Sequence, residues 1–373
     1  MPKASGPPIS QRELNRATLA RQLLLERAPM SVPDALEHLV GLQAQTVNTW
    51  YTGLWSRLRD FDPLEASQLL EQREIVRIAL MRSTIHLVTA RDAVGLRPVL
   101  QPAVARPMSG RRRPLAEHAD EITAEGRRLL AAGPLNNRDL AAELAKRWPQ
   151  FTPDDLPMAV RVGVPLVQVT PRGTWNASGD AAHSPLDQWL AGGTDAARDA
   201  LDTPCVILDE LVLRYLGAFG PATPADAQNW SRLSRLREVF ERLRPQLVTF
   251  TAEDGRELFD LPDAPRPGAE TAAPARLLYD FDNLLLGHAD RSRFAFDEWH
   301  PWMISVTQRF AHGSLLVDGL VVGVWRLERG KTARVIIKPA GRLPKADRDA
   351  AAGEAESLLD MWAPESVHEV SFA

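Results

Sequence analysis

The chain has 373 residues with 45% hydrophobic and 25% charged side chains, an ordinary balance for a soluble protein of two or three domains. No apolar run is long enough for a membrane span, residues 1–10 lack the apolar core of a signal peptide, and a single cysteine, Cys205, excludes an internal disulfide. The net charge of −4 argues against indiscriminate nucleic-acid binding but not against a local basic face, and we expect a cytoplasmic protein.

The first part of the chain has the element order of a winged helix-turn-helix, in which helices precede a β-hairpin. We expect helices over residues 14–27, from Ser31 to Leu42 and over 64–72, followed by strands over 75–80 and 84–89. Met81-Arg82-Ser83 forms the turn between the two strands. We therefore assign residues 10–105 to a first winged helix.

Two glutamines, Gln43 and Gln45, flank Ala44 where the second of these helices is expected to end. In a continued helix their side chains would point about 200° apart and could not share a substrate. In an extended chain they would face the same side, because side chains alternate. Residues 46–49 are poor helix formers, which favours an end near Leu42. A functional pair therefore requires the helix to end here; otherwise the motif is two exposed amides.

Residues 97–114 resemble a linker, since they are rich in proline and arginine and contain the triplet Arg111, Arg112 and Arg113. Beyond them we expect helices over 122–131 and 137–148, helical spacing over 157–168 and a small wing over 167–175. These elements form a second winged helix, assigned to residues 115–195.

A third winged helix, assigned to residues 203–262, has clear turn signals. A helix is expected over 209–219, Thr223 and Pro224 fit the cap and first position of a short helix, and strands over 247–251 and 257–261 flank Asp254-Gly255. The helix over 234–243 occupies the place of a recognition helix, which lies in the major groove in helix-turn-helix proteins. Arginines line it, so Arg235 is a candidate DNA contact; the alternative is the solvated face of a packed helix.

The C-terminal region, residues 275–373, mixes strands with one long helix. Strands over 314–317 and 320–326 flank Asp318-Gly319, further strands are expected over 333–337 and 367–372, and a helix is expected over 345–362. Upstream, His288 and Asp290 alternate like metal ligands, but no third ligand has a suitable spacing. The sequence contains no phosphate-binding loop, dinucleotide fingerprint or Gly-x-Ser-x-Gly motif, so we expect neither a metal nor a cofactor.

Four motifs are similar to those of the AlkZ/YcaQ family of bacterial DNA glycosylases, and the resemblance covers nearly the whole chain. They are Leu42-Gln43-Ala44-Gln45, Met81-Arg82-Ser83-Thr84-Ile85-His86-Leu87, Gly220-Pro221-Ala222-Thr223 and Leu286-Gly287-His288-Ala289-Asp290-Arg291. The resemblance implies a mixed α and β, helix-dominated fold of three tandem winged helices with a concave DNA-binding surface. In one branch the catalytic triplet is Gln, an apolar residue and Gln, and in the other it ends in Asp; this chain resembles the first, AlkZ-like branch.

The resemblance implies a monofunctional glycosylase that hydrolyses the N-glycosidic bond of N7-alkylated purines in double-stranded DNA, with Gln43 and Gln45 holding the nucleophilic water. The branch is linked to self-resistance against azinomycin B and unhooks its interstrand crosslinks. Because an N7-alkylated purine is a cationic, labile leaving group, amide dipoles are sufficient catalysts. A crosslinked base cannot rotate out whole, so an open surface is expected. Candidate DNA contacts are His288, Asp290, Arg291, Arg293, Arg111, Arg112, Arg113 and Arg235.

Three alternatives stay open from the sequence. Winged helices also occur in transcription regulators, which bind DNA without catalysis and usually dimerise to read two half-sites. Since no dimer helix is evident, we expect a monomer. A glycosylase limited to N7-alkyl monoadducts would have the same sequence features. Finally, Asp290 with Arg291 or Arg293 can serve only to cap a turn.

Overall fold

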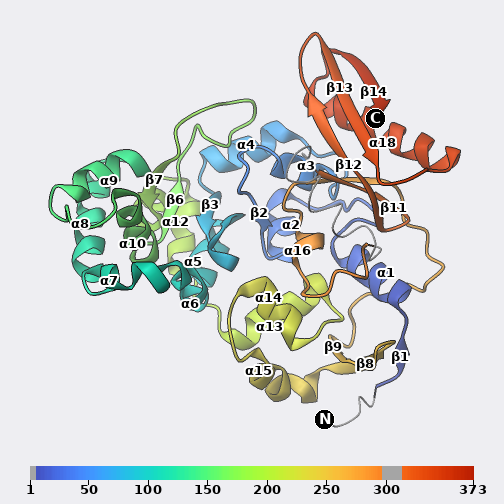
Figure 1. Cartoon of the computed structure of the whole chain (residues 1–373), viewed down its shortest axis with the longest axis horizontal. Helices are drawn as coiled ribbons and strands as arrows, with labels where there is room; N and C mark the ends of the chain where they lie inside the picture. Colours follow the sequence, from blue (N-terminus) through green and yellow to red (C-terminus); the bar gives the residue numbers. More distant parts are fainter. Residues whose placement is uncertain (1–5, 296–312) are drawn as a thin grey trace.

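The strands of the protein form three sheets, with helices packed between and around them (Figure 1). The structure is a computed structural model that describes residues 6–295 and 313–373. Within these ranges helices predominate over strands, which confirms the expected mixed α and β fold. None of the helices in the same ranges is both long and apolar enough to cross a membrane.

The first unit places helices before a strand pair, in the expected order. Its elements are α1 (Gln11–Arg21), α2 (Val32–His38), β2 (Leu42–Gln43), α3 (Trp50–Trp55), α4 (Pro63–Glu71), β3 (Ile75–Ala79) and β4 (Ile85–Thr89). Helix α1 is shorter than the expected 14–27, because Leu23 adopts a left-handed backbone with a φ of 58°. Helix α3 was not expected: all six of its residues are buried, so no polar face marks a helical period.

The prediction of a linker over residues 97–114 is wrong. Helix α5 (Ala90–Val99) extends into this segment, and α6 (Gln101–Val104) and α7 (Arg113–Ala116) follow. Pro102 and Pro114 lie in the first turns of α6 and α7. There a missing backbone N–H costs nothing and a fixed φ favours the helix. The prolines that suggest a linker therefore begin short helices.

The second unit consists of three longer helices and three short strands. Its elements are α8 (Ala119–Ala131), β5 (Leu135–Asn136), α9 (Asn137–Ala145), α10 (Leu156–Gly163), β6 (Leu166–Gln168) and β7 (Ala182–Pro185). The helical pattern expected over 157–168 breaks after Gly163, since Pro165 disfavours helical backbone at Val164. Strand β6 pairs with β7, which was not expected from the sequence.

One sheet joins the first two units. Strand β3 pairs antiparallel with β6, which gives six strands in the order β2-β4-β3-β6-β7-β5. This sheet continues from the first unit into the second. The boundary expected between the two units therefore stays a prediction. Helices α11 (Leu186–Ala191) and α12 (Asp195–Asp199) then lead to the third unit.

The third unit contains each element expected from the sequence. These are α13 (Leu208–Phe219), α14 (Pro224–Ser231), α15 (Leu236–Leu243), β8 (Val248–Ala252) and β9 (Glu257–Asp260). Thr223 caps α14 and exchanges hydrogen bonds with Asp226, a complete capping box. The N-terminal strand β1 (Pro8–Ile9) adds parallel to β8, so the chain returns here to its own start.

The C-terminal region forms a five-stranded sheet covered by a long helix. Its elements are β10 (Arg276–Tyr279), α16 (Asn283–Leu286), β11 (Gly313–Val317), β12 (Leu320–Glu328), β13 (Thr332–Pro339), α18 (Lys345–Trp362) and β14 (Val367–Phe372). The strand order is β10-β11-β12-β13-β14, so β14 is an edge strand. In Figure 1 this sheet stands above the first unit, and α16 lies beside α2.

Buried contacts cross between these regions. One hydrophobic cluster combines Ile78 of the shared sheet with Phe219 of the third unit, and another combines Leu87 with Leu277 and Leu359 of the C-terminal region. Two fully buried ion pairs also join these regions. They connect Arg21 with Asp260 at 2.6 Å and Arg57 with Asp282 at 2.7 Å. The region around the Gln pair is therefore held from several sides.

Candidate active site

The Gln pair lies in extended chain, as the functional hypothesis requires. Helix α2 ends at His38, earlier than the expected Leu42, and Gly41 turns the chain with a φ of 84°. A Cβ at this position would lie 2.5 Å from the side chain of Val88, so the turn requires glycine. Strand β2 then pairs antiparallel with β4, with Gln43 opposite His86. The prediction that the helix ends before the pair is confirmed.

Gln43 is nearly buried, with 4% of its surface exposed, and its amide has one defined orientation. Its Oε1 accepts a hydrogen bond from Nη2 of Arg82 at 2.5 Å. A guanidinium only donates, so the oxygen must face it and the NH2 group must point away. Nη1 of Arg82 donates to the carbonyl of Trp230 in α14 at 2.8 Å. Arg82 therefore links the amide of Gln43 to the third unit.

Gln45 is exposed and is held by the backbone of β4. Its Oε1 accepts from the backbone N–H of Ile85 at 3.2 Å. Ala44, fully buried between the two glutamines, donates its N–H to the carbonyl of Ile85 at 2.8 Å and accepts at its own carbonyl from Arg77 at 2.9 Å. Each glutamine thus uses one lone pair of its carbonyl. Neither NH2 group donates to any residue in the described ranges, so both remain available to a substrate or water.

Three buried side chains near the pair, those of Arg77, Arg82 and His86, are positively charged or neutral. Burial lowers the pKa of Arg77 and of Arg82 to about 10, which still leaves both charged near neutral pH. Burial, together with the nearby Arg82, lowers the pKa of His86 to about 3, so this histidine is neutral. Such a weak base does not remove a proton from water near pH 7. The arrangement orients neutral amides and supplies no strong general base.

A second segment clamps the Gln motif from the C-terminal side. Asp280 accepts hydrogen bonds from the hydroxyls of Thr46 and Thr49, which directly follow the pair. Asn283 donates to the carbonyl of Gly41 at 2.6 Å, directly before it. These contacts could not be predicted from the sequence, because residues more than 200 positions apart carry no local signal of their pairing.

Two of the expected DNA contacts are wrong. His288 is 1% exposed, its Nε2 bonds to the carbonyl of Phe219 at 3.0 Å, and burial lowers its pKa to about 3. Arg293 is 7% exposed and donates to the hydroxyl of Thr18 and the carbonyl of Pro221. Both side chains hold the turn of residues 287–293 against the third unit. They are structural and do not face a duplex.

The neighbouring residues of this turn have different roles. Asp290 accepts from the backbone N–H of Ser292 at 2.9 Å and pairs with Arg256 at 2.6 Å. Although burial opposes it, these hydrogen bonds lower the pKa of Asp290 to about 2. The carboxylate therefore caps a turn, the alternative noted above. Arg291 is half-buried, which lowers its pKa, and its side chain makes no hydrogen bond within the described ranges, so it stays a candidate phosphate contact.

The other candidate arginines and their neighbours differ in whether they form ion pairs. Arg112 pairs with Asp155 at 2.6 Å, which weakens the case for a phosphate contact, whereas Arg113 is exposed. The side chain of Arg111 lies outside the described part of the structure. Arg235 is exposed directly before α15, Arg232 is exposed at the end of α14, and Arg237 is exposed in the first turn of α15. Later arginines on that helix are neutralised: Arg242 pairs with Asp209, and Arg244 pairs with Glu241 and Glu257. The start of α15 is thus its basic end.

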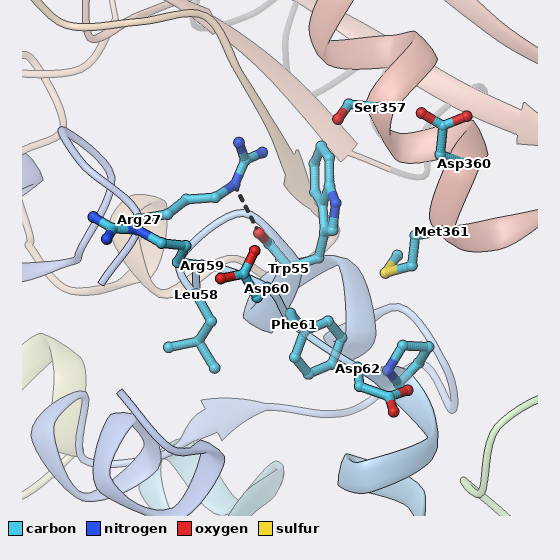
Figure 2. Close-up of a pocket in the computed structure, with 11 residues that line it drawn as sticks. Arg27, Trp55, Leu58, Arg59, Asp60, Phe61, Asp62, Ser357, Asp360 and Met361 are labelled. Carbon is cyan, nitrogen blue, oxygen red and sulfur yellow. Dashed lines mark hydrogen bonds between the residues drawn. The ribbon is translucent and has the colours of Figure 1, made fainter. Parts of the chain in front are cut away.

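A cavity of about 590 Å³ lies away from these residues, between the loop that follows α3 and helix α18 (Figure 2). Arg27 stacks over Trp55 and donates to its carbonyl at 2.9 Å on one side, and Asp360 and Met361 line the other. None of its lining residues belongs to the predicted site. The Gln pair is not part of this cavity, in keeping with the expectation of an open surface.

The chain is similar to proteins of a known family. The sequence profile of a family described as "DNA glycosylase AlkZ-like" matches residues 36–361, most of the chain. The chain belongs to the AlkZ-like family of DNA glycosylases. An AlkZ-like relative from Streptomyces sahachiroi, described as an interstrand DNA cross-link repair glycosylase, is 24% identical over 332 residues, which cover 85% of this chain and 88% of the relative.

The fold agrees with that of a solved AlkZ-like protein. The structure of the Streptomyces sahachiroi DNA glycosylase AlkZ superposes with a TM-score of 0.72 at 21% identity, covering 98% of this chain and 100% of AlkZ. The AlkZ-like motif Gln43-Ala44-Gln45 falls within the matched family range. The chain is therefore a DNA glycosylase, and DNA is its substrate.

Proposed function

We propose that this glycosylase hydrolyses the N-glycosidic bond of N7-alkylated purines and that Gln43 and Gln45 hold the attacking water. The observation that carries the proposal is the pair of oriented amides on extended chain at β2. Each amide retains an NH2 group and one carbonyl lone pair. One water can accept a hydrogen bond from an NH2 group and donate one to a carbonyl, which directs its remaining lone pair toward the sugar.

The chemistry needs no strong acid or base at the leaving group. As the water oxygen bonds to C1′ of the deoxyribose, the bond from C1′ to N9 breaks and its electron pair neutralises the cationic purine. The proton lost from the water passes to solvent. The sugar is oxocarbenium-like in the transition state, and carbonyl dipoles near it favour that positive charge. Because the purine is already activated, this modest stabilisation is sufficient.

We further propose that the substrates include interstrand crosslinks through N7 of purines, such as those of azinomycin B. The name of the Streptomyces sahachiroi relative supports this, since it specifies crosslink repair. A crosslinked purine is tethered to the opposite strand and cannot enter an enclosed pocket. The exposure of Gln45 favours a site that meets the lesion within the duplex. Arg113, Arg235 and Arg291 are the remaining candidates for phosphate contacts among the predicted residues with described side chains. We propose a cytoplasmic monomer that acts through its three winged-helix units.

The test is an unhooking assay on a duplex with one azinomycin-type crosslink, in parallel with a duplex carrying N7-methylguanine. We expect the wild-type protein and the surface control Lys345→Ala to separate the crosslinked strands on a denaturing gel and to leave alkali-cleavable abasic sites in both duplexes. Gln43→Ala and Gln45→Ala should lose both activities. Abasic sites from N7-methylguanine alone would restrict the enzyme to monoadducts. Tight binding without abasic product from either duplex would leave a DNA-binding regulator.

A further inference from the structure

A large aromatic side chain is exposed beside the Gln motif. Phe281, in the turn between β10 and α16, has 46% of its surface exposed. Asp280, its neighbour, bonds to Thr46, the neighbour of Gln45. The hydrogen bond between Asp280 and Thr46 therefore joins the sequence neighbours of Phe281 and Gln45. An aromatic ring left in water at this place gains nothing from the hydrophobic effect in the free protein.

The backbone of Phe281 is also strained. Its φ of 58° lies in the left-handed region, which glycine and asparagine adopt readily and which is a genuine outlier for a bulky residue. The conformation is unfavourable for an ordinary L-residue, because its Cβ comes too close to the following carbonyl oxygen. Strain of this kind persists where the surrounding structure imposes it, and it concentrates at functional sites.

The residues on both sides of Phe281 impose this conformation. Asp280 is fixed by Thr46 and Thr49. Asp282 forms the fully buried pair with Arg57 and caps α16 through the N–H of Leu284 at 2.9 Å. The turn is therefore rigid, and the phenyl ring is displayed from it rather than left on a mobile loop. Arg57 neutralises the charge of Asp282, whereas the threonine hydroxyls that bind Asp280 leave its carboxylate charged.

We propose that Phe281 is a stacking residue that contacts the face of a nucleobase next to the lesion when the protein binds DNA. The inference rests on the proposed function, because it takes the substrate to be a damaged duplex. Apolar side chains that enter a base step unstack it and bend the duplex. For a crosslinked purine, which cannot rotate out whole, opening the stack beside it would bring C1′ to the water held by Gln43 and Gln45 without extrusion.

The geometry permits a test in which removal of the ring does not damage the fold. Phe281→Gly and Phe281→Asn both suit the left-handed backbone, so we expect their melting temperature to equal or exceed that of the wild type. Phe281→Tyr keeps the ring in the same backbone and is the matched control. The probe is a duplex with a 2′-fluoro-N7-methyldeoxyguanosine, whose glycosidic bond resists cleavage, and 2-aminopurine as the adjacent base.

We expect the wild type and Phe281→Tyr to raise the 2-aminopurine fluorescence on binding, as the base leaves its neighbours. Phe281→Gly and Phe281→Asn should lack this rise and bind the lesion duplex about 10-fold more weakly, because stacking on an aromatic side chain contributes about 1–3 kcal/mol per base. Equal fluorescence and affinity in all four proteins would overturn the inference. The proposed function is judged separately, by abasic-site formation by the wild type on cleavable N7-methylguanine.

Discussion

Arg82 gives the amide of Gln43 a single orientation, which a glutamine at the surface would not have. The guanidinium bonds to Oε1 at 2.5 Å, and its other nitrogen is anchored on the carbonyl of Trp230. The backbone of Arg82 itself is left-handed, with a φ of 56°, so the turn at Met81–Ser83 is shaped to present this side chain. Catalysis by a neutral amide depends on such preorganisation, because glutamine has no useful basicity.

Replacing Arg82 should therefore slow the reaction more than it weakens DNA binding. We expect Arg82→Gln to lower the single-turnover rate about 10-fold, in line with the loss of one hydrogen bond to a charged group. Arg82→Lys keeps a charged donor and should recover part of the rate. The measurement is single-turnover base release, with the dissociation constant determined on the same duplex. An unchanged rate, or a loss that appears wholly in affinity, would contradict the positioning role.

The turn between β10 and α16 connects the C-terminal sheet to the Gln motif through contacts that are distant in sequence. Its anchor is the ion pair of Asp282 with Arg57, in which neither side chain is exposed. Removing one partner of such a pair leaves the other charge buried and unpaired, which is much more costly than losing a surface pair.

We expect Asp282→Ala to lower the free energy of unfolding by about 3–5 kcal/mol. The surface control Lys345→Ala removes the partner of Asp349 on α18 and should change it by less than about 1 kcal/mol. Urea unfolding followed by circular dichroism measures both. Equal stability of the two variants would show that the buried pair does not anchor the turn.

The elements that local signals specify were predicted well. Thr223 and Pro224 mark the start of α14, Asp254-Gly255 and Asp318-Gly319 mark the two hairpins, and α18 has the expected bounds. The errors arise where tertiary context decides. Helix α3 is buried on all sides, Pro102 and Pro114 lie in the first turns of short helices, and β7 belongs to a sheet shared by two units.

The candidate site shows the same division. The end of the helix before Gln43 and Gln45 could be predicted, because it is a local feature, whereas the role of the two glutamines as a pair stays a prediction. Arg82 was visible as part of a motif, but its bond to Gln43 depends on a hairpin folding back across the sheet. His288 lies in a recognisable motif as well, yet burial makes it structural. A sequence motif shows that a residue is important. It does not show whether the residue contacts the substrate or supports the fold.

Three histidines, two in the shared six-stranded sheet and one in the turn of residues 287–293, are buried in neutral form, and this links stability to pH. Burial lowers the pKa of His86 and His288 to about 3 and that of His183 to about 4. In the unfolded chain each has a pKa near 6.5. Protonation below that value therefore favours the unfolded state, so the stabilisation is complete above about pH 6.5 and is lost as the pH falls toward the folded-state values.

We expect the free energy of unfolding to fall between about pH 7 and about pH 5 by roughly 2 kcal/mol for each of these histidines. Urea titrations at the two pH values measure the change, and His183→Gln should reduce it by its own share. Asp290, with a pKa of about 2, stays ionised in this window, whereas burial raises the pKa of Glu354, which opposes the fall in stability. A free energy of unfolding that is the same at both pH values would show that the histidines are not buried as described.

The catalytic role of Gln43 and Gln45 is tested most directly by the single-turnover rate of base release from a duplex carrying N7-methylguanine, with dissociation constants measured alongside. We expect Gln43→Ala and Gln45→Ala to release free 7-methylguanine at least about 100-fold more slowly than the wild type, as for the loss of an oriented group in other active sites, while binding the duplex with similar affinity. Wild-type rates in both variants would contradict it and place the catalytic water elsewhere on the molecule.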